Sequence, residues 1–214
     1  MNTGDTAFMM ICAALVFFMT PGLAFFYGGL VRRKNVCNTI MACVAIMGLS
    51  VVMWTLFGYS LSFGGNHAGI IGDFRWFGLN GVGMEAGPYA DSIPHLVFCA
   101  FQMMFAMITP ALITGSLVGR MKFKALFLFV AIWSVIVYYP MTHMVWGDGG
   151  FLAAIGSVDF AGGDVVHISS GISALVLAII LGRRRGYEHT TYRIHNIPSV
   201  VLGASLLWFG WFGF

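Results

Sequence analysis

The segment "DFAGGDVVHISSG", residues 159–171, places ionisable side chains at the start of an otherwise apolar stretch. His167 lies about one turn inside that stretch, where an imidazole is costly without a partner, so His167 is a functional candidate by default. The alternatives are a packing imidazole bonded to a neighbouring helix and a haem ligand. A haem would need a second histidine at matched depth, and His95 and His143 lie near the outer ends of their own apolar stretches.

Two acids stand beside this histidine. Asp159 directly precedes the apolar stretch, where a carboxylate accepts hydrogen bonds from the free amides of a helix N-terminus and matches the helix dipole. The same negative charge would steady a nearby cation. We expect Asp159 to cap the helix, with its effect on a cation as a by-product, and Asp164 to share the capping role.

Aromatic residues could bind a small cation at the outer end of the protein. Phe101 and Phe105 are four residues apart on one helix face, so their rings could stack across a pore, although ordinary core or lipid-facing rings would look the same. Gln102 beside them is an expensive polar side chain in a membrane span and indicates a lumen. Trp146 is either an interfacial belt residue or a cation–π platform at an entrance.

The elements that position these residues are predicted to be membrane helices. Charged residues make up 9% of the 214 residues and apolar residues 59%, which excludes an ordinary soluble domain. Each of six stretches free of charged residues is long enough to cross a bilayer as a helix. The six stretches are Thr6–Val31, Asn38–Phe63, Ser92–Gly119, Ala125–Trp146, Val165–Gly182 and Ile197–Phe214.

The basic residues set the orientation. Ten of the eleven Lys and Arg side chains follow the first, third or fifth stretch, so the positive-inside rule places that side in the cytoplasm and the N-terminus outside. Seven of the eight acids then fall on the outer side, which favours the approach of a cation. The ten cations are Arg32, Arg33, Lys34, Arg120, Lys122, Lys124, Arg183, Arg184, Arg185 and Arg193. They are dispersed in short clusters, so no nucleic-acid partner is predicted.

The pattern also divides the chain. Residues 1–182 form a first repeat of five helices, residues 183–196 a polar cytoplasmic connection, and residues 197–214 a sixth helix. The Gly-rich segment 64–91 is expected to fold over the outer surface. Five helices are an odd number, so a second repeat would be inverted, and we expect more protein after Phe214. The cysteines show neither metal nor disulfide spacing, and no metal or cofactor is predicted.

Several motifs, in order along the whole chain, resemble the ammonium transporter (Amt/Mep/Rh) family. They are "GLAFFYGGLVRRKNV" (22–36), "FQMMFA" (101–106), "VWGDGG" (145–150), "DFAGGDVVHISSG" (159–171) and "WFGWFGF" (208–214). The resemblance implies no enzyme but a homotrimer of eleven-helix subunits in the plasma (inner) membrane, each with its own pore. This chain would hold the first five-helix inverted repeat and the first helix of the second.

The resemblance also implies a role for each matching residue. Trp146 would help to recruit ammonium, with Phe101 beside it in an outer vestibule. The rings of Phe105 and Phe214 would close the outer gate. Asp159 would be the buried acid needed for recruitment and for the integrity of the fold. His167 would be the first of two pore histidines, the second lying beyond Phe214. Asp164 departs from the family pattern, in which this position is usually uncharged.

The expected activity is therefore ammonium transport, with ammonia passing a hydrophobic pore and His167 accepting or relaying the proton. The main alternative is an ammonium sensor on the same scaffold, coupled to a downstream cytoplasmic domain. A cytoplasmic P-II-like nitrogen regulatory protein is the partner that the family suggests. An aquaporin-like channel is a weaker reading, because "NIP" (196–198) is a single near-match where two Asn-Pro-Ala loops are needed.

Overall fold

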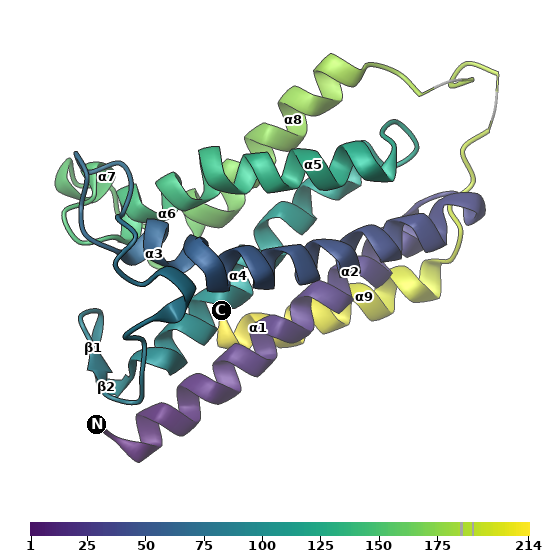
Figure 1. Ribbon diagram of the computed structural model, residues 1–214. Helices are drawn as coiled ribbons and strands as arrows, with labels where there is room; N and C mark the ends of the chain where they lie inside the picture. Colours follow the sequence, from purple (N-terminus) through teal and green to yellow (C-terminus); the bar gives the residue numbers. More distant parts are fainter. Residues whose placement is uncertain (185, 190) are drawn as a thin grey trace.

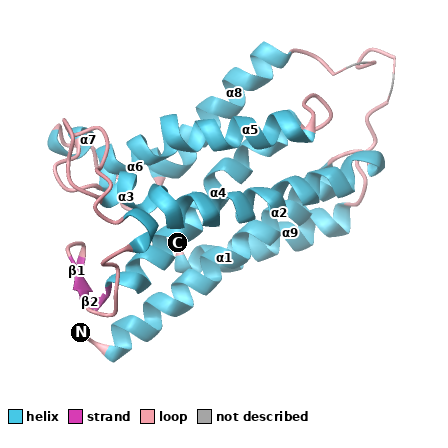
Figure 2. Ribbon diagram, viewed as in Figure 1, coloured by secondary structure: helices cyan, strands magenta, loops and turns pink. Residues whose placement is uncertain are grey.

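The computed structural model describes residues 1–184, 186–189 and 191–214, so Arg185 and Thr190 of the predicted cytoplasmic connection lie outside the described residues. The helices run roughly along one direction of an elongated bundle (Figure 1). Nearly all of the described regular structure is helical (Figure 2). The exception is one short antiparallel pair, which the all-helical prediction missed.

Each of the six predicted stretches contains a helix. Five are long and apolar enough to cross a membrane, and the sixth is shorter. Two of the spans and the start of a third contain π-helical turns, in which the hydrogen-bond ladder is widened. The elements are α1 Thr3–Leu30; α2 Val36–Met53, joined by the π-helical turn Trp54–Gly58 to α3 Tyr59–Phe63; α4 His95–Leu117; α5 Phe123–Trp133, joined by Ser134–Tyr138 to α6 Tyr139–Trp146; α7 Phe151–Ala154; the π-helical turn Gly163–Ile168 and α8 Ser169–Leu181; and α9 Ile197–Gly210 with the 3₁₀ turn Trp211–Gly213.

Helix α9 lies along α1, at glycine positions that allow close backbone approach (Figure 1). A Cβ atom on Gly203 would collide with the backbone of Phe26. A Cβ atom on Gly29 would come within 2.6 Å of the Val200 side chain. The start of α9 is fixed by Asn196, whose side-chain oxygen accepts a 3.0 Å hydrogen bond from the Ser199 amide. The C-terminal end of α9, next to Phe214, therefore lies against the N-terminal half of α1.

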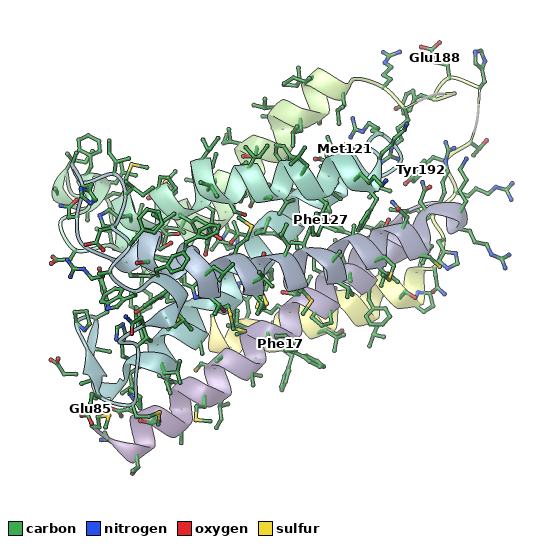
Figure 3. The ribbon with its side chains drawn as sticks, in the orientation of Figure 1. Phe17, Glu85, Met121, Phe127, Glu188 and Tyr192 are labelled. Carbon is green, nitrogen blue, oxygen red and sulfur yellow. The ribbon has the colours of Figure 1, made fainter. Side chains whose placement is uncertain are left out.

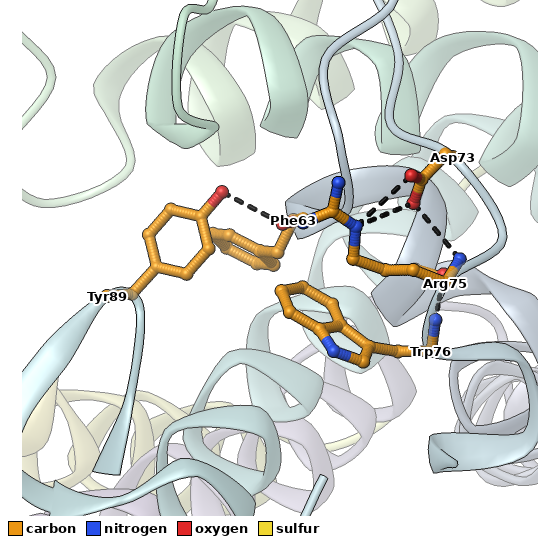
Figure 4. Close-up of polar contacts among 6 residues, drawn as sticks. Phe63, Asp73, Arg75, Trp76 and Tyr89 are labelled. Atoms are coloured by element: carbon orange, nitrogen blue, oxygen red, sulfur yellow. Dashed lines mark hydrogen bonds and ion pairs between the residues drawn. The ribbon is translucent and has the colours of Figure 1, made fainter. Parts of the chain in front are cut away.

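The segment after α3 folds over the end of the bundle that carries the N-terminus, which we call the outer end after the orientation predicted from the sequence (Figure 1). It contains the strands β1 Ala86–Gly87 and β2 Ala90–Pro94. Tyr89 in the turn between them donates a 2.9 Å hydrogen bond to the carbonyl of Phe63 at the end of α3 (Figure 4). Trp76 donates its amide to the Ser60 hydroxyl at 2.9 Å. These bonds hold the segment against the helices, so that it covers the end of α3.

An ion pair also orders this outer segment. The Arg75 guanidinium lies 3.1 Å from the Asp73 carboxylate (Figure 4). Burial acts to raise the pKa of Asp73, but hydrogen bonds from the backbone amides of Arg75 and Gly65, together with the Arg75 charge, lower that pKa below its ordinary value. Asp73 therefore stays ionised in the folded state at neutral pH.

The two other histidines of the helical spans have partners of their own. His95 is buried at the start of α4 and its Nε2 lies 2.6 Å from the Tyr59 hydroxyl. His143 in α6 is fully buried, with Nδ1 3.0 Å from the Ser62 carbonyl and Nε2 3.3 Å from Asn66. Both side chains therefore fasten the outer helix ends together, and neither contacts His167.

Candidate functional site

Asp159 organises the start of α8. Its Oδ1 accepts a 2.8 Å hydrogen bond from the Gly163 amide, and its Oδ2 accepts from the amides of Asp164 at 2.8 Å and Val165 at 3.0 Å. The predicted cap is thereby confirmed, and one carboxylate satisfies three donors that the helix start leaves free. This is possible because Gly162 takes a left-handed conformation, φ 78°, and turns the chain back toward Asp159.

Asp164 does not share the capping, contrary to our expectation. Its own amide donates to Asp159, and its Oδ2 accepts a 2.8 Å hydrogen bond from the Ser157 hydroxyl. The amides of Gly163, Asp164 and Val165 already donate to Asp159, so these donors are not left for Asp164. Asp164 instead braces the loop that precedes Asp159.

Trp146 connects this acid to the aromatic residues. The indole Nε1 donates a 2.9 Å hydrogen bond to the backbone carbonyl of Asp159. The Trp146 ring meets the Phe105 ring edge to face, with centroids 6.2 Å apart. Because its N–H is engaged, Trp146 has a fixed orientation and its ring face is available to a ligand.

The phenyl rings predicted to lie together do so. The centroids of Phe101 and Phe105 are 4.9 Å apart, with the rings nearly perpendicular. Phe105 meets Phe214 at 4.9 Å in the same edge-to-face manner. The two rings come from α4 and from the residue after the final 3₁₀ turn, so the contact joins segments more than a hundred residues apart. Phe105 is buried, which places this pair at the floor of the outer cavity rather than on its rim.

An outer cavity of about 650 Å³ lies over this pair. Five of the six predicted site residues line it: Trp146, Phe101, Phe105, Asp159 and Phe214. Gln102 also lines it, and its Oε1 is buried without a hydrogen-bond partner among the described residues. Gln102 thus lies at the cavity wall, and its assignment to the lumen of a pore stays a prediction. A cavity with aromatic walls and the Asp159 segment at its edge suits a small cation.

His167 lies behind the cavity floor, on the far side of Phe214. Its ring centroid is 5.6 Å from that of Phe214, and it stacks on Trp211 at 6.2 Å with 12° between the planes. Its Nδ1 is 2.9 Å from the carbonyl of Gly162. A carbonyl only accepts, so Nδ1 carries the proton in this contact and Nε2 presents a lone pair. Nε2 has no hydrogen-bond partner among the described residues, and the side chain is exposed on the surface of α8.

Several contributors to the site were not predicted. Trp211 stacks on His167, the Gly162 carbonyl binds the imidazole, and Phe8 and Cys12 of α1 add to the cavity wall. The motif "WFGWFGF" contains Trp211, so an aromatic signal was present at that position. Nothing local in the sequence indicates the Gly162 contact, because it depends on the widened helical turn.

Comparison with known proteins decides the family. The sequence pattern of the Ammonium Transporter Family matches residues 7–214. The chain belongs to the ammonium transporter family. It is 50% identical to an ammonium transporter of Bacillus subtilis over 214 residues, covering all of this chain and 52% of that protein. The family is one of transporters and not of enzymes, and this member is a multi-pass membrane protein.

Solved structures agree with the fold. The chain is similar to crystallised Candida albicans Mep2, with a TM-score of 0.85 and 32% identity, over all of this chain and 48% of that one. It is also similar to a structure described as a sensor Amt protein, with a TM-score of 0.85 and 30% identity, over 97% of this chain and 52% of that one. The chain therefore spans about half the length of the relatives that it matches.

Proposed function

We propose that the complete protein carries ammonium across a membrane through a pore that this chain begins to enclose. The observation that supports this is a continuous aromatic path. Trp146 faces Phe105 in the outer cavity, Phe105 meets Phe214, and Phe214 meets His167 behind it. A cation attracted to the cavity thus reaches a hydrophobic closure with an imidazole directly beyond.

The arrangement of cavity, phenyl rings and imidazole along the path would select ammonium over potassium. Ammonium and potassium are close in size, but only ammonium donates hydrogen bonds and can give up a proton. In the cavity, the Trp146 ring replaces part of the hydration shell of ammonium. Beyond the two phenyl rings a bare charge is costly, whereas neutral ammonia is not. The roles of Trp146 and Phe101 are recruitment, and those of Phe105 and Phe214 are closure.

His167 is the proposed proton acceptor. The Gly162 carbonyl holds the proton on Nδ1, so Nε2 is the nitrogen that meets the substrate. The second imidazole that the family pattern implies lies after Phe214 and would complete the relay. The exposed face of α8 around His167 is then the wall of the pore, covered by the second repeat. Asp159 acts by fixing the start of α8 and by adding negative potential at the entrance.

We also propose the repeat organisation, membrane orientation and assembly of the complete protein. Residues 1–182 form the first repeat, residues 183–196 the cytoplasmic connection, and residues 197–214 the opening of an inverted second repeat. The basic residues lie in the cytoplasm and the N-terminus outside, in the plasma or inner membrane. Three subunits assemble, each with its own pore, and a P-II-like protein is the regulatory partner.

A sensor on the same scaffold is the second candidate, favoured by the likeness to the sensor Amt structure. A sensor needs the outer cavity but no relay, so His167 separates the two functions. The complete reading frame should be reconstituted in proteoliposomes on a solid-supported membrane, and the current recorded after ammonium and potassium pulses. Transport predicts a saturable current with ammonium alone, which His167→Ala abolishes or makes unselective.

His189→Ala is the matched control, because it removes an imidazole from the connection after α8. It should leave the current unchanged. An internal pH dye would detect electroneutral ammonia entry if no current is seen. Ammonium binding without current or pH change would establish the sensor and refute transport. Equal flux in His167→Ala and the parent protein would refute the assigned proton acceptor.

A further inference from the structure

A second large cavity, of about 630 Å³, lies at the opposite end of the bundle from the outer site. It is formed by the α1–α2 junction, the α4–α5 turn, the end of α8 and the segment that follows. Met121 and Tyr192, which line it, lie at the end away from Glu85 of the outer segment (Figure 3). Its basic lining residues are Arg32, Lys34, Arg120, Lys122, Arg183 and Arg184.

Little negative charge balances five of these cations, Lys34, Arg120, Lys122, Arg183 and Arg184, among the described residues. No carboxylate lines the cavity among the described residues. Glu188 lies close by and pairs with Arg183 at 2.6 Å, but both side chains are well exposed, so the pair contributes little. Arg120 donates a 2.9 Å hydrogen bond to the carbonyl of Gly182 at the end of α8. That bond fixes the position of the guanidinium without neutralising its charge.

The cavity is also preorganised. The Tyr192 ring has the Arg32 guanidinium 5.0 Å from its centroid and the Arg184 guanidinium 4.8 Å away. Both cations are therefore held against one ring, a cation–π arrangement that keeps like charges near each other. Two like charges fixed in this way repel, and an anion between them removes the repulsion.

Two helices begin near this cavity, although the Val36 amide at the start of α2 already donates to the Arg33 carbonyl. The start of α2 has no side-chain cap and no acid in its first turn, and Asn35 and Asn38 line the cavity. The start of α5 likewise has neither, and Lys122 precedes it in the cavity wall. The positive end of a helix dipole attracts anions. The lining of cations and the two helix starts thus favour the same ligand chemistry.

We propose that this cavity binds a phosphate group, at a site separate from the ammonium path. Guanidinium and ammonium groups around amide donors are the set that recognises phosphate oxygens. The group comes either from the headgroup of an anionic lipid or from a soluble phosphate compound. Basic cavities at this side of membrane helices suit lipid headgroups, and a cavity of this volume admits either source.

The test uses the complete protein in nanodiscs and two probes. Inorganic pyrophosphate is titrated by calorimetry in phosphatidylcholine nanodiscs. Separately, the protein is released from nanodiscs that contain phosphatidylglycerol, and native mass spectrometry detects the lipid that stays bound to it. The variant Lys34→Gln/Lys122→Gln removes two cations of the cavity. Arg33→Gln/Lys124→Gln removes the same charge from neighbouring exposed positions that do not line it.

We expect Lys34→Gln/Lys122→Gln to weaken binding about 30-fold. Each cation contributes about 1 kcal/mol of attraction to the anion, and about 1.4 kcal/mol corresponds to a tenfold change in affinity. The control variant should bind within about threefold of the parent protein. Saturable pyrophosphate binding identifies a soluble source, and selective retention of phosphatidylglycerol identifies a lipid, and either supports the site. Equal weakening in both variants, or no saturable binding of either probe, overturns it. All four side chains are exposed, so loss of folding is not expected to obscure the result.

Discussion

Removing the Asp159 carboxylate should destabilise the protein by an amount that its three hydrogen bonds allow us to work out. In Asp159→Ala the amide of Gly163 is exposed and can bind water, so its loss costs about 1 kcal/mol. The Asp164 amide is partly buried and costs about the same. Val165 is fully buried, so its unpaired amide costs about 2 kcal/mol. The expected total is about 4 kcal/mol.

Asp159→Asn should destabilise the protein less than Asp159→Ala, because the asparagine side chain keeps one of the two accepting oxygens. If the amide oxygen takes the place of Oδ2, it still accepts from Asp164 and Val165. Only the exposed Gly163 bond and the negative charge are lost, which amounts to about 1–2 kcal/mol. The two substitutions at one position therefore separate the capping bonds from the charge.

The assay is thermal unfolding of the complete protein in detergent, followed by intrinsic fluorescence. Asp164→Asn is the matched control, since it removes a neighbouring acid that accepts from one hydroxyl only. The decrease in the midpoint should be largest for Asp159→Ala, smaller for Asp159→Asn and smallest for Asp164→Asn. An Asp159→Ala midpoint equal to that of the Asp164 control would refute the capping argument. In that event the acid would serve the entrance potential and not the fold.

Three other perturbations test the fold around the site. Gly203→Val should force α9 away from α1 and destabilise the protein by about 3 kcal/mol in thermal unfolding, whereas Gly48→Val, with no atom within 4 Å of the added Cβ, should not. Tyr59→Phe leaves the buried His95 Nε2 without its partner and should lower the free energy of unfolding by about 1–3 kcal/mol, seen as a lower thermal midpoint; no change would mean that water replaces the hydroxyl. The lowered pKa of Asp73 stabilises the fold above its ordinary pKa of about 4, and this stability is lost as pH falls through the lower folded value. Asp73→Asn should flatten the midpoint's pH dependence in that acid range, and an unaltered profile would contradict the assignment.

The helices were predictable because membrane spans follow from apolar length alone. All six stretches contain helices, and the basic ends of several spans gather at one cavity, as the charge distribution indicated. The contact of Phe105 with Phe214 was expected only from the resemblance to the family. Apolar length carries no information on which faces of two distant helices meet, so composition alone could not have paired these rings.

The contact between the Gly162 carbonyl and His167 was not predicted, because it depends on which backbone groups are hydrogen-bonded within one turn. The widened turn Gly163–Ile168 exists because Asp159 takes three amides and Gly162 turns the chain, and only then does the Gly162 carbonyl meet His167. A hydropathy pattern is nearly the same for a helical and a π-helical turn. The strands β1 and β2 are too short to give a repeating pattern, so that pair was missed.

The pairing of α1 with α9 has a consequence for biosynthesis. Helix α1 ends at residue 30 and α9 begins only at residue 197. At typical synthesis rates α1 waits on the order of ten to thirty seconds before its partner leaves the ribosome. During that interval the glycine-lined face of α1 is covered by lipid, by an earlier helix or by the insertion machinery. The packing of α9 on α1 thus forms late, after the other described helices have been synthesised.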